Sequence, residues 1–265
     1  MRPAALAAWL IVMVSAPAPS HAETALVAVA ANFAAVAAEI ERQFEQSGEH
    51  TIDLVIGSTG KLYAQIVNGA PFHVLLSADQ ERPRRLVDAG LAVRGSQRTY
   101  AIGELVLWSP DPDRLQGEGA AVLRAGDFRS LAIANPRLAP YGTAAVQALE
   151  ALDVYQDVRD RIVMGENVGQ AHAMVASGNA ELGLIALSSV MRPGDPQSGS
   201  SWKLPNQLHS PIRQDAVLLT RGSNNGSARA FLEFLSSETA TELIERYGYQ
   251  LEERRGRTDL RSERR

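Results

Sequence analysis

The stretch Val55-Ile56-Gly57-Ser58-Thr59-Gly60-Lys61-Leu62 decides how this chain folds. The largely apolar run over 52–56 predicts a strand, and four small residues follow it. Leu62 and Ile66 then recur at helical spacing. The sequence therefore predicts a strand that runs into a helix through a short turn of small, hydroxyl-bearing residues.

Such a turn is a candidate anion site. The first N–H groups of a helix have no partner within the helix and carry partial positive charge. Ser58 and Thr59 add two hydroxyl donors at the same place. In the simpler alternative, one of these hydroxyls caps the helix and the turn binds nothing. The residues of the turn leave both interpretations open.

Gly-Ser-Thr-Gly-Lys is also similar to the end of a nucleotide-binding P-loop. That motif needs a glycine five residues before Gly60 and a hydroxyl residue after Lys61. Val55 and Leu62 occupy those positions. The hydroxyl that would bind the metal ion is missing, so we exclude a nucleotide site.

The N-terminus has the pattern of an export signal. Arg2 precedes an apolar run over 4–14, which is too short to span a bilayer comfortably, and Ser20-His21-Ala22 fits a cleavage site. We therefore predict a signal peptide over 1–22, with a retained membrane anchor as the alternative. The mature protein is expected to be soluble and periplasmic. The chain has no cysteine, which excludes disulfides and a lipid attached to cysteine.

The charge balance argues against nucleic acid as a partner. The chain has 26 Lys and Arg against 30 Asp and Glu, a formal net charge of -4. A protein that binds nucleic acid usually carries a basic face. The remaining length suffices for one large domain or two small ones.

Strand, short turn and helix alternate along most of the chain, which is typical of α/β proteins with parallel sheets. Apolar runs predict strands over 26–30, 52–56, 72–76, 103–108, 131–134, 182–186 and 216–219. Helices are expected in between, including one from Ala144. The segment 192–210, rich in Pro, Gly and Ser, is predicted to be a loop.

These elements divide into two α/β lobes. We expect lobe one over 23–102 plus 215–250, lobe two over 103–214 and a disordered tail over 251–265. The chain then crosses between lobes twice, as in proteins that close like a hinge on a ligand. The cleft would collect the turns that follow the strands.

Those turns carry donors without charge. They include Asn32, Ser58, Thr59, the hydroxyl of Tyr141 and the N–H groups near 167–168. Several helix starts that converge on one point can hold a dehydrated dianion. Such a site favours a fully deprotonated tetrahedral oxyanion, which has only acceptors.

The chain resembles the periplasmic molybdate-binding proteins, the substrate-binding subunits of molybdate ABC importers, over residues 26–249. Each matching piece is short, and their order and spacing together carry the resemblance. The pieces are Val27-Ala28-Val29-Ala30-Ala31-Asn32-Phe33, Gly57-Ser58-Thr59-Gly60-Lys61-Leu62, Gln65-Ile66-Val67-Asn68-Gly69-Ala70-Pro71-Phe72, Leu76-Ser77-Ala78-Asp79, Ala134-Asn135-Pro136, Ala139-Pro140-Tyr141-Gly142, Glu166-Asn167-Val168 and Glu245-Arg246-Tyr247-Gly248-Tyr249.

The resemblance implies a type II periplasmic-binding fold of two lobes, each a mainly parallel sheet flanked by helices. It implies that molybdate or tungstate is held by neutral hydrogen bonds, without direct metal ligands and without a cofactor. The donors carried over are Ala31, Asn32, Ser58, Tyr141 and Val168, with Thr59 as an additional candidate. The implied partner is an ABC permease at the inner membrane, and we expect a monomer.

The chain departs from the family at three places. Ala31 stands where many members have a hydroxyl residue, and the Tyr that some members place after the strand ending at 185–187 is missing. His73 replaces a usual Asp, and we interpret it as structural. These departures bear on single contacts rather than on the class of ligand.

Three alternatives remain. Another oxyanion such as sulfate has the same shape and differs in size. A periplasmic hydrolase lacks support, because the five histidines show no metal-ligand spacing and no Gly-x-Ser-x-Gly elbow occurs. His172 as a general base is less well supported than a packing role. An interaction module that uses the Arg-rich tail would lose its function if residues 251–265 were deleted.

Overall fold

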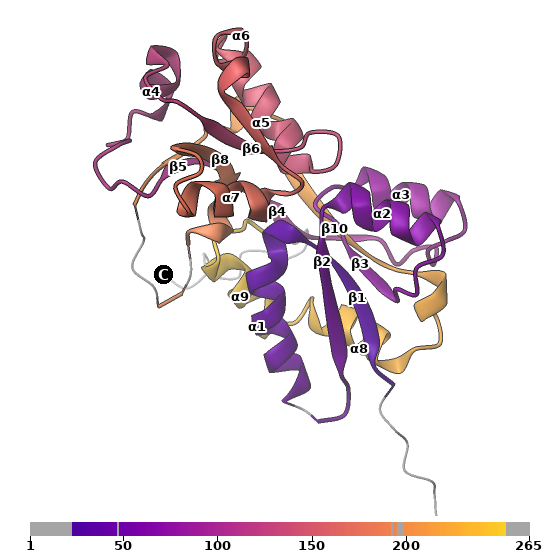
Figure 1. The fold of residues 1–265 in the computed structure, drawn as a ribbon. Helices are drawn as coiled ribbons and strands as arrows, with labels where there is room; N and C mark the ends of the chain where they lie inside the picture. The colour runs from indigo at the N-terminus through magenta and orange to yellow at the C-terminus, as the bar shows by residue number, and fades with distance from the viewer. Residues whose placement is uncertain (1–22, 47, 192, 195–198, 253–265) are drawn as a thin grey trace, which may run out of the picture.

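Two α/β lobes make up the computed structural model, which describes residues 23–252 except 47, 192 and 195–198 (Figure 1). The predicted signal peptide and residues 253–265 of the predicted tail lie outside the described residues. Each lobe contains one five-stranded sheet flanked by helices. The predicted two-lobed α/β fold is confirmed.

The first sheet has the strand order β2-β1-β3-β10-β4. Its strands are β1 (Ala25–Ala30), β2 (Ile52–Gly57), β3 (Val74–Leu76), β4 (Arg98–Gly103) and β10 (Ile212–Leu218). β1 pairs in parallel with β2 and β3, whereas β10 runs antiparallel to both β3 and β4. Four strands therefore point the same way, as a mainly parallel sheet requires.

The second sheet repeats this plan with the order β7-β6-β8-β5-β9. Its strands are β5 (Leu105–Ser109), β6 (Leu131–Ala134), β7 (Ile162–Gly165), β8 (Leu182–Ala186) and β9 (Ser200–Lys203). β6 is parallel to β7 and β8, and β5 is antiparallel to β8 and β9. The carboxyl ends of the parallel strands in both sheets lead into the turns discussed below.

Helices cover both faces of the first sheet. α1 (Ala34–Glu45), α8 (Gly226–Phe234) and α9 (Glu238–Arg246) share one core with Val27 and Val29. α2 (Thr59–Val67) and α3 (Glu81–Asp88) share a second core with Ala28. Because successive strand residues point to opposite faces, the near-continuous apolar run of β1 fills both cores.

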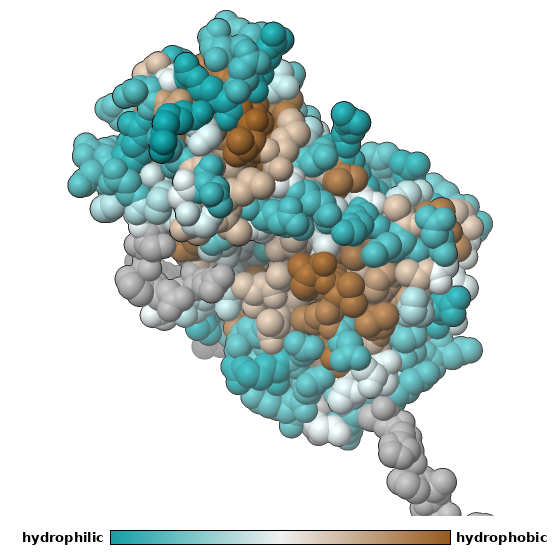
Figure 2. Space-filling model, in the orientation of Figure 1, coloured by the Kyte–Doolittle hydropathy of each residue, from teal (hydrophilic) through white to brown (hydrophobic). Residues whose placement is uncertain are grey.

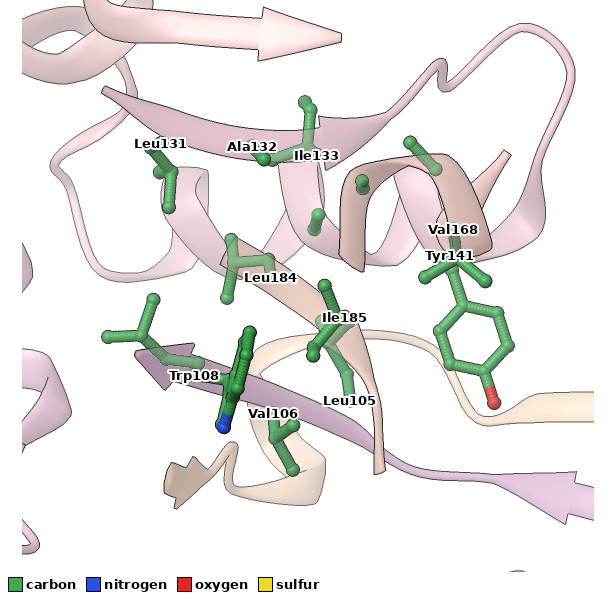
Figure 3. Packing of buried hydrophobic residues seen from close by; sticks show 14 of the residues in the cluster. Leu105, Val106, Trp108, Leu131, Ala132, Ile133, Tyr141, Val168, Leu184 and Ile185 are labelled. Atoms are coloured by element: carbon green, nitrogen blue, oxygen red, sulfur yellow. The ribbon is translucent and has the colours of Figure 1, made fainter. Parts of the chain in front are cut away.

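The helices of the second lobe surround a single large core (Figure 3). They are α4 (Gly119–Ala125), α5 (Pro140–Ala151), α6 (Tyr155–Val158) and α7 (Val168–Ala176). Short 3₁₀ helices occur at Ala31–Phe33 (η1), Arg159–Arg161 (η2), Leu187–Ser189 (η3), Asn206–Leu208 (η4) and Thr220–Gly222 (η5). Among the described residues, no helix has both the length and the apolar character needed to cross a membrane.

The chain passes between the sheets twice, first between Gly103 and Leu105 and again between Lys203 and Ile212. The single strand predicted over 103–108 is therefore wrong: Gly103 ends β4 in one sheet, and β5 begins in the other. Glu104 between them is buried, with its carboxylate 3.1 Å from Nζ of Lys203. The sequence shows an uninterrupted extended run here because both sides of the crossing are extended.

Two further predictions need correction. The segment 192–210 is not wholly a loop, since residues 200–203 form β9. Trp202 of β9 packs directly against Gly119, where an added Cβ would lie 2.5 Å from the indole ring. α5 begins at Pro140 instead of Ala144. Pro is favourable in the first turn of a helix, where its missing N–H is not needed. The earlier start places Tyr141 inside the first turn of a helix.

Candidate anion-binding site

The turns singled out in the sequence meet at one small cavity between the lobes. It is lined by Ala30, Ala31, Asn32, Ser58, Thr59, Ala78, Ala139, Pro140, Tyr141, Asn167 and Val168. The structure thus brings together all five predicted donors and Thr59. Two larger open hollows are lined by none of these five donors; one lies beside Ser109 and Glu181, and the other beside Ala78 and Arg213.

Four helix starts surround the cavity. The first lobe contributes η1, which begins at Ala31, and α2, which follows Ser58. The second lobe contributes α5, which begins at Pro140, and α7, which begins at Val168. Their partial positive charges therefore converge from both sides, which is the arrangement that favours an anion.

Ser58 occupies the N-cap position of α2 but does not cap it. Its side chain accepts no hydrogen bond from the helix, and its Oγ is buried without a partner. A buried hydroxyl without a hydrogen bond is unfavourable. The simple capping alternative therefore fails for Ser58, whose hydroxyl remains available to a molecule in the cavity.

The hydroxyl oxygen of Thr59 accepts one hydrogen bond within the protein. Its Oγ1 accepts a hydrogen bond of 3.1 Å from the N–H of Ala78, in the loop after β3. Because the oxygen acts as the acceptor in that bond, the hydroxyl hydrogen is left to donate elsewhere. Thr59 is 1% exposed and lines the cavity, so its hydroxyl is a candidate further donor there.

Asn32 uses its side chain to hold the turn. Its Nδ2 donates to Oε1 of Gln214 at 2.7 Å and to the hydroxyl of Tyr249 at 3.1 Å. The backbone carbonyl oxygen of Asn32 accepts hydrogen bonds from the hydroxyls of Tyr249 at 2.8 Å and of Ser188 at 3.0 Å. Both amide hydrogens are thus engaged, and the backbone N–H is what Asn32 can offer to an anion.

Tyr141 reaches in two directions. Its backbone N–H lies in the first turn of α5 and has no backbone acceptor among the described residues. Its hydroxyl points away from the core cluster (Figure 3), toward Gly103 and Gln214 at the crossing between lobes. Burial raises the pKa of this hydroxyl well above 10. The hydroxyl stays protonated and is buried without a partner among the described residues, so both the N–H and the hydroxyl of Tyr141 are left as donors.

The next residue fixes this position. A Cβ on Gly142 would lie 2.2 Å from the carbonyl oxygen of Ala134, the last residue of β6. Only glycine lets α5 start this close to the strand. The close approach places the Tyr141 N–H at the carboxyl edge of the second sheet.

Val168 is the first residue of α7. Asn167 caps this helix by accepting a hydrogen bond of 3.0 Å from the N–H of Gln170. A Cβ on Gly169 would lie 3.8 Å from Cβ of Ala31, so the start of α7 faces the first turn of the other lobe. The N–H groups of Ala31 and Val168 therefore belong to opposing walls of the same cavity.

The lining contains no charged side chain. The charged groups stand outside, where Nζ of Lys61 lies 3.0 Å from Oε2 of Glu166 across the cleft. Among the described residues no group of three or more His, Asp or Glu could hold a metal ion directly. A site built from neutral donors suits a ligand that carries its own negative charge and has acceptors on all sides.

Several residues of the site could not be assigned from sequence. Gln214 and Tyr249 hold Asn32 from β10 and from the loop after α9, and Ser188 reaches it from the second lobe. Tyr249 lies in a stretch that resembles the family, which was the only signal for it. His73 is structural as predicted, since its Nδ1 accepts a 2.8 Å hydrogen bond from the N–H of Leu26. His172 packs against Trp108, with ring centroids 5.1 Å apart.

Comparison with known proteins decides the family. Residues 25–250 match the bacterial extracellular solute-binding proteins. The chain belongs to this family. The family binds solutes rather than transforming them, which removes support from the hydrolase alternative.

Two curated members are similar over most of their length. The molybdate-binding protein ModA of Azotobacter vinelandii is 48% identical over 226 residues, 85% of this chain and 89% of the relative. ModA of Rhodobacter capsulatus is 45% identical over 88% of this chain and 91% of the relative. The solved structure of the periplasmic molybdate-binding protein of Azotobacter vinelandii superposes with a TM-score of 0.83 at 38% identity. It covers 86% of this chain and 100% of that structure.

Proposed function

We propose that this protein binds molybdate or tungstate in the interlobe cavity and delivers it to an ABC importer. The observation that carries the proposal is the buried, unpartnered hydroxyl of Ser58 at a cavity where four helix starts converge and no charged side chain intervenes. Relatives at 45–48% identity that are named for molybdate binding support the choice of ligand.

The proposed ligand shell spans both lobes. Lobe one offers the N–H groups of Ala31 and Asn32 and the hydroxyl of Ser58, with the hydroxyl of Thr59 as a further donor. Lobe two offers the N–H groups of the residues that begin α5 and α7, which are Tyr141 and Val168. An anion held by both lobes stabilises the closed arrangement, so ligand binding and lobe closure are one equilibrium.

The shell also gives a reason for selectivity. A fully deprotonated tetrahedral oxyanion accepts hydrogen bonds on every oxygen, and four groups of the proposed shell are backbone N–H groups, which can only donate. A protonated oxygen of phosphate that faces one of these N–H groups would place donor against donor, which costs the free energy of an unmade hydrogen bond. Sulfate satisfies the same donors and is smaller, so cavity size must separate it from molybdate.

The proposal includes a cellular setting. We infer a periplasmic monomer, exported by the segment 1–22, that requires no cofactor and presents both lobes to an ABC permease. The relative of solved structure is a periplasmic protein, which supports periplasmic localisation.

Thermal unfolding with different anions tests this function. The protein is unfolded alone and with molybdate, tungstate, sulfate or phosphate at equal ionic strength. A ligand that binds only the native state at a hundredfold excess over Kd stabilises it by about 2.7 kcal/mol. We expect a shift with molybdate and tungstate only. A shift with sulfate as well would indicate a general oxyanion receptor, and no shift with any anion would refute the proposal.

A further inference from the structure

A direct backbone hydrogen bond joins the two lobes beside the cavity. The N–H of Gly60, the second residue of α2, donates to the carbonyl oxygen of Leu138 at 2.8 Å. Leu138 lies in the turn that precedes α5, so the bond runs from one lobe to the other. Both residues neighbour the helix starts that supply the proposed anion donors.

The two backbones are too close for a side chain at this point. A Cβ on Gly60 would lie 3.0 Å from the carbonyl oxygen of Leu138 and 3.1 Å from its Cα. It would also lie 3.3 Å from Nη2 of Arg82. The atoms of Leu138 are backbone and cannot rotate away. Arg82 forms an ion pair with Asp79 and donates to the carbonyl oxygen of Arg137, which limits its freedom as well.

The need for glycine comes from the opposite lobe rather than from its own backbone. Gly60 lies within α2 and does not have a positive φ. An alanine could adopt this helical conformation, and alanine is the better helix former. The missing side chain is therefore required only when the lobes are together.

An ion pair on the surface lies next to the contact between Gly60 and Leu138. Nζ of Lys61 lies 3.0 Å from Oε2 of Glu166, also across the cleft. Figure 2 shows hydrophilic residues along the line where the two lobes meet on this face. Exposed ion pairs contribute little to stability. The backbone contact beside this ion pair is the more rigid of the two, because neither backbone can rotate away.

We propose that Gly60 is a positioning residue for ligand capture: its missing side chain lets α2 touch the turn before α5, and this contact sets the degree of lobe closure over the anion. The inference rests on the proposed function. Because Ser58 and Thr59 precede Gly60 in the same turn, any separation at Gly60 moves these donors away from Tyr141 and Val168 on the other lobe.

The test is Gly60→Ala, with Gly226→Ala as the matched control. Gly226 also lies in the first turn of a helix, and a Cβ there meets nothing closer than Cε1 of His50 at 3.9 Å. Molybdate affinity is measured by calorimetry and the Tm of the unliganded protein by scanning calorimetry. We expect Gly60→Ala to raise the Kd about tenfold or more, while the Tm stays level or rises. Gly226→Ala should leave the Kd unchanged.

Weaker molybdate binding combined with an unchanged or higher Tm separates a positioning role of Gly60 from damage to the fold. A Kd within twofold of wild type would overturn the inference. A lower Tm of the unliganded protein together with weaker binding would also overturn it, because a contact confined to the closed state cannot destabilise the open one. Lys61→Met should change the Kd far less than Gly60→Ala, since it removes only the exposed ion pair.

A second measurement keeps the inference independent of the identity of the ligand. The chain has no cysteine, so Gln65→Cys on α2 and Glu150→Cys on α5 would carry a specific pair of spin labels across the lobes. The distance between them reports closure. Gly60→Ala should deplete the short distance in the unliganded protein and with molybdate; equal distributions would refute the role of Gly60. Should the wild type bind no oxyanion, the proposed function fails, and this distance still decides the role of Gly60.

Discussion

Replacing Ser58 with alanine removes a buried hydroxyl at the cavity that neither caps its helix nor pairs with another described group. In the proposed site its partner is the anion. A hydrogen bond to a charged group contributes about 1–3 kcal/mol, so the Kd for molybdate should rise about 5- to 150-fold. Because no internal hydrogen bond is lost, the free energy of unfolding of the unliganded protein should change by less than about 0.5 kcal/mol.

Ser237 provides the matched control. It also occupies an N-cap position, but its hydroxyl accepts a hydrogen bond of 3.2 Å from the N–H of Ala240 in α9. Ser237→Ala should lower the free energy of unfolding by about 1 kcal/mol, which corresponds to roughly 2–4 °C in Tm for a chain of this size. The Kd of this variant should equal that of wild type.

The assay is isothermal titration of each variant with molybdate, combined with urea unfolding of the unliganded protein. If Ser58 were an ordinary cap, Ser58→Ala would behave like Ser237→Ala, with lower stability and an unchanged Kd. That result would remove Ser58 from the binding site.

Three further outcomes follow from the same contacts. Asn167→Ala removes the cap of α7 and should lower the free energy of unfolding by about 1 kcal/mol and weaken molybdate binding; unchanged binding in titration calorimetry would separate the cap from the site. Thr59→Val leaves the N–H of Ala78 buried without its acceptor and should cost about 1–3 kcal/mol in urea unfolding, which a stability equal to wild type would contradict. Burial raises the pKa of Tyr249 to about 12, and it raises the pKa values of Tyr100 and Tyr141 well above 10. The unfolded chain then loses these protons first, so stability should be constant below about pH 9 and fall as the pH rises through 10–12; a flat profile in urea unfolding would contradict this.

The local pattern was sufficient for most of the elements and for the neighbourhood of the site. β1 could be read from sequence because a strand buried on both faces must be apolar at nearly every position. The turns after β1 and β2 could be located because an apolar run ends there and apolar residues then recur at helical spacing. The convergence of the turns followed from a general property of α/β sheets, whose ligands lie beyond the carboxyl ends of strands.

Other features depend on residues distant in sequence. β9 forms because it pairs with β5 and because Trp202 packs against Gly119. Nothing in the surrounding Pro-, Gly- and Ser-rich sequence indicates a strand. The crossing at Glu104 interrupts an extended run that looks continuous. The first turn of α5 likewise depends on the approach of Gly142 to β6.

The sequence by itself determined most of the order of strands, turns and helices, the two-lobed class and the turns that gather at the cavity, because periodicity and turn chemistry are local properties of the chain. The resemblance to a known family added Ala31 and Val168 as donors within those turns. Only the tertiary structure decided which atom of each residue faces the cavity. Gln214 and Tyr249 occupy the Asn32 amide, the start of α5 turns the Tyr141 N–H toward the cleft, and Ser58 is left without a partner. Hydrogen bonds are satisfied across the whole fold, so the atoms left free for a ligand are known only when every other pairing is in place.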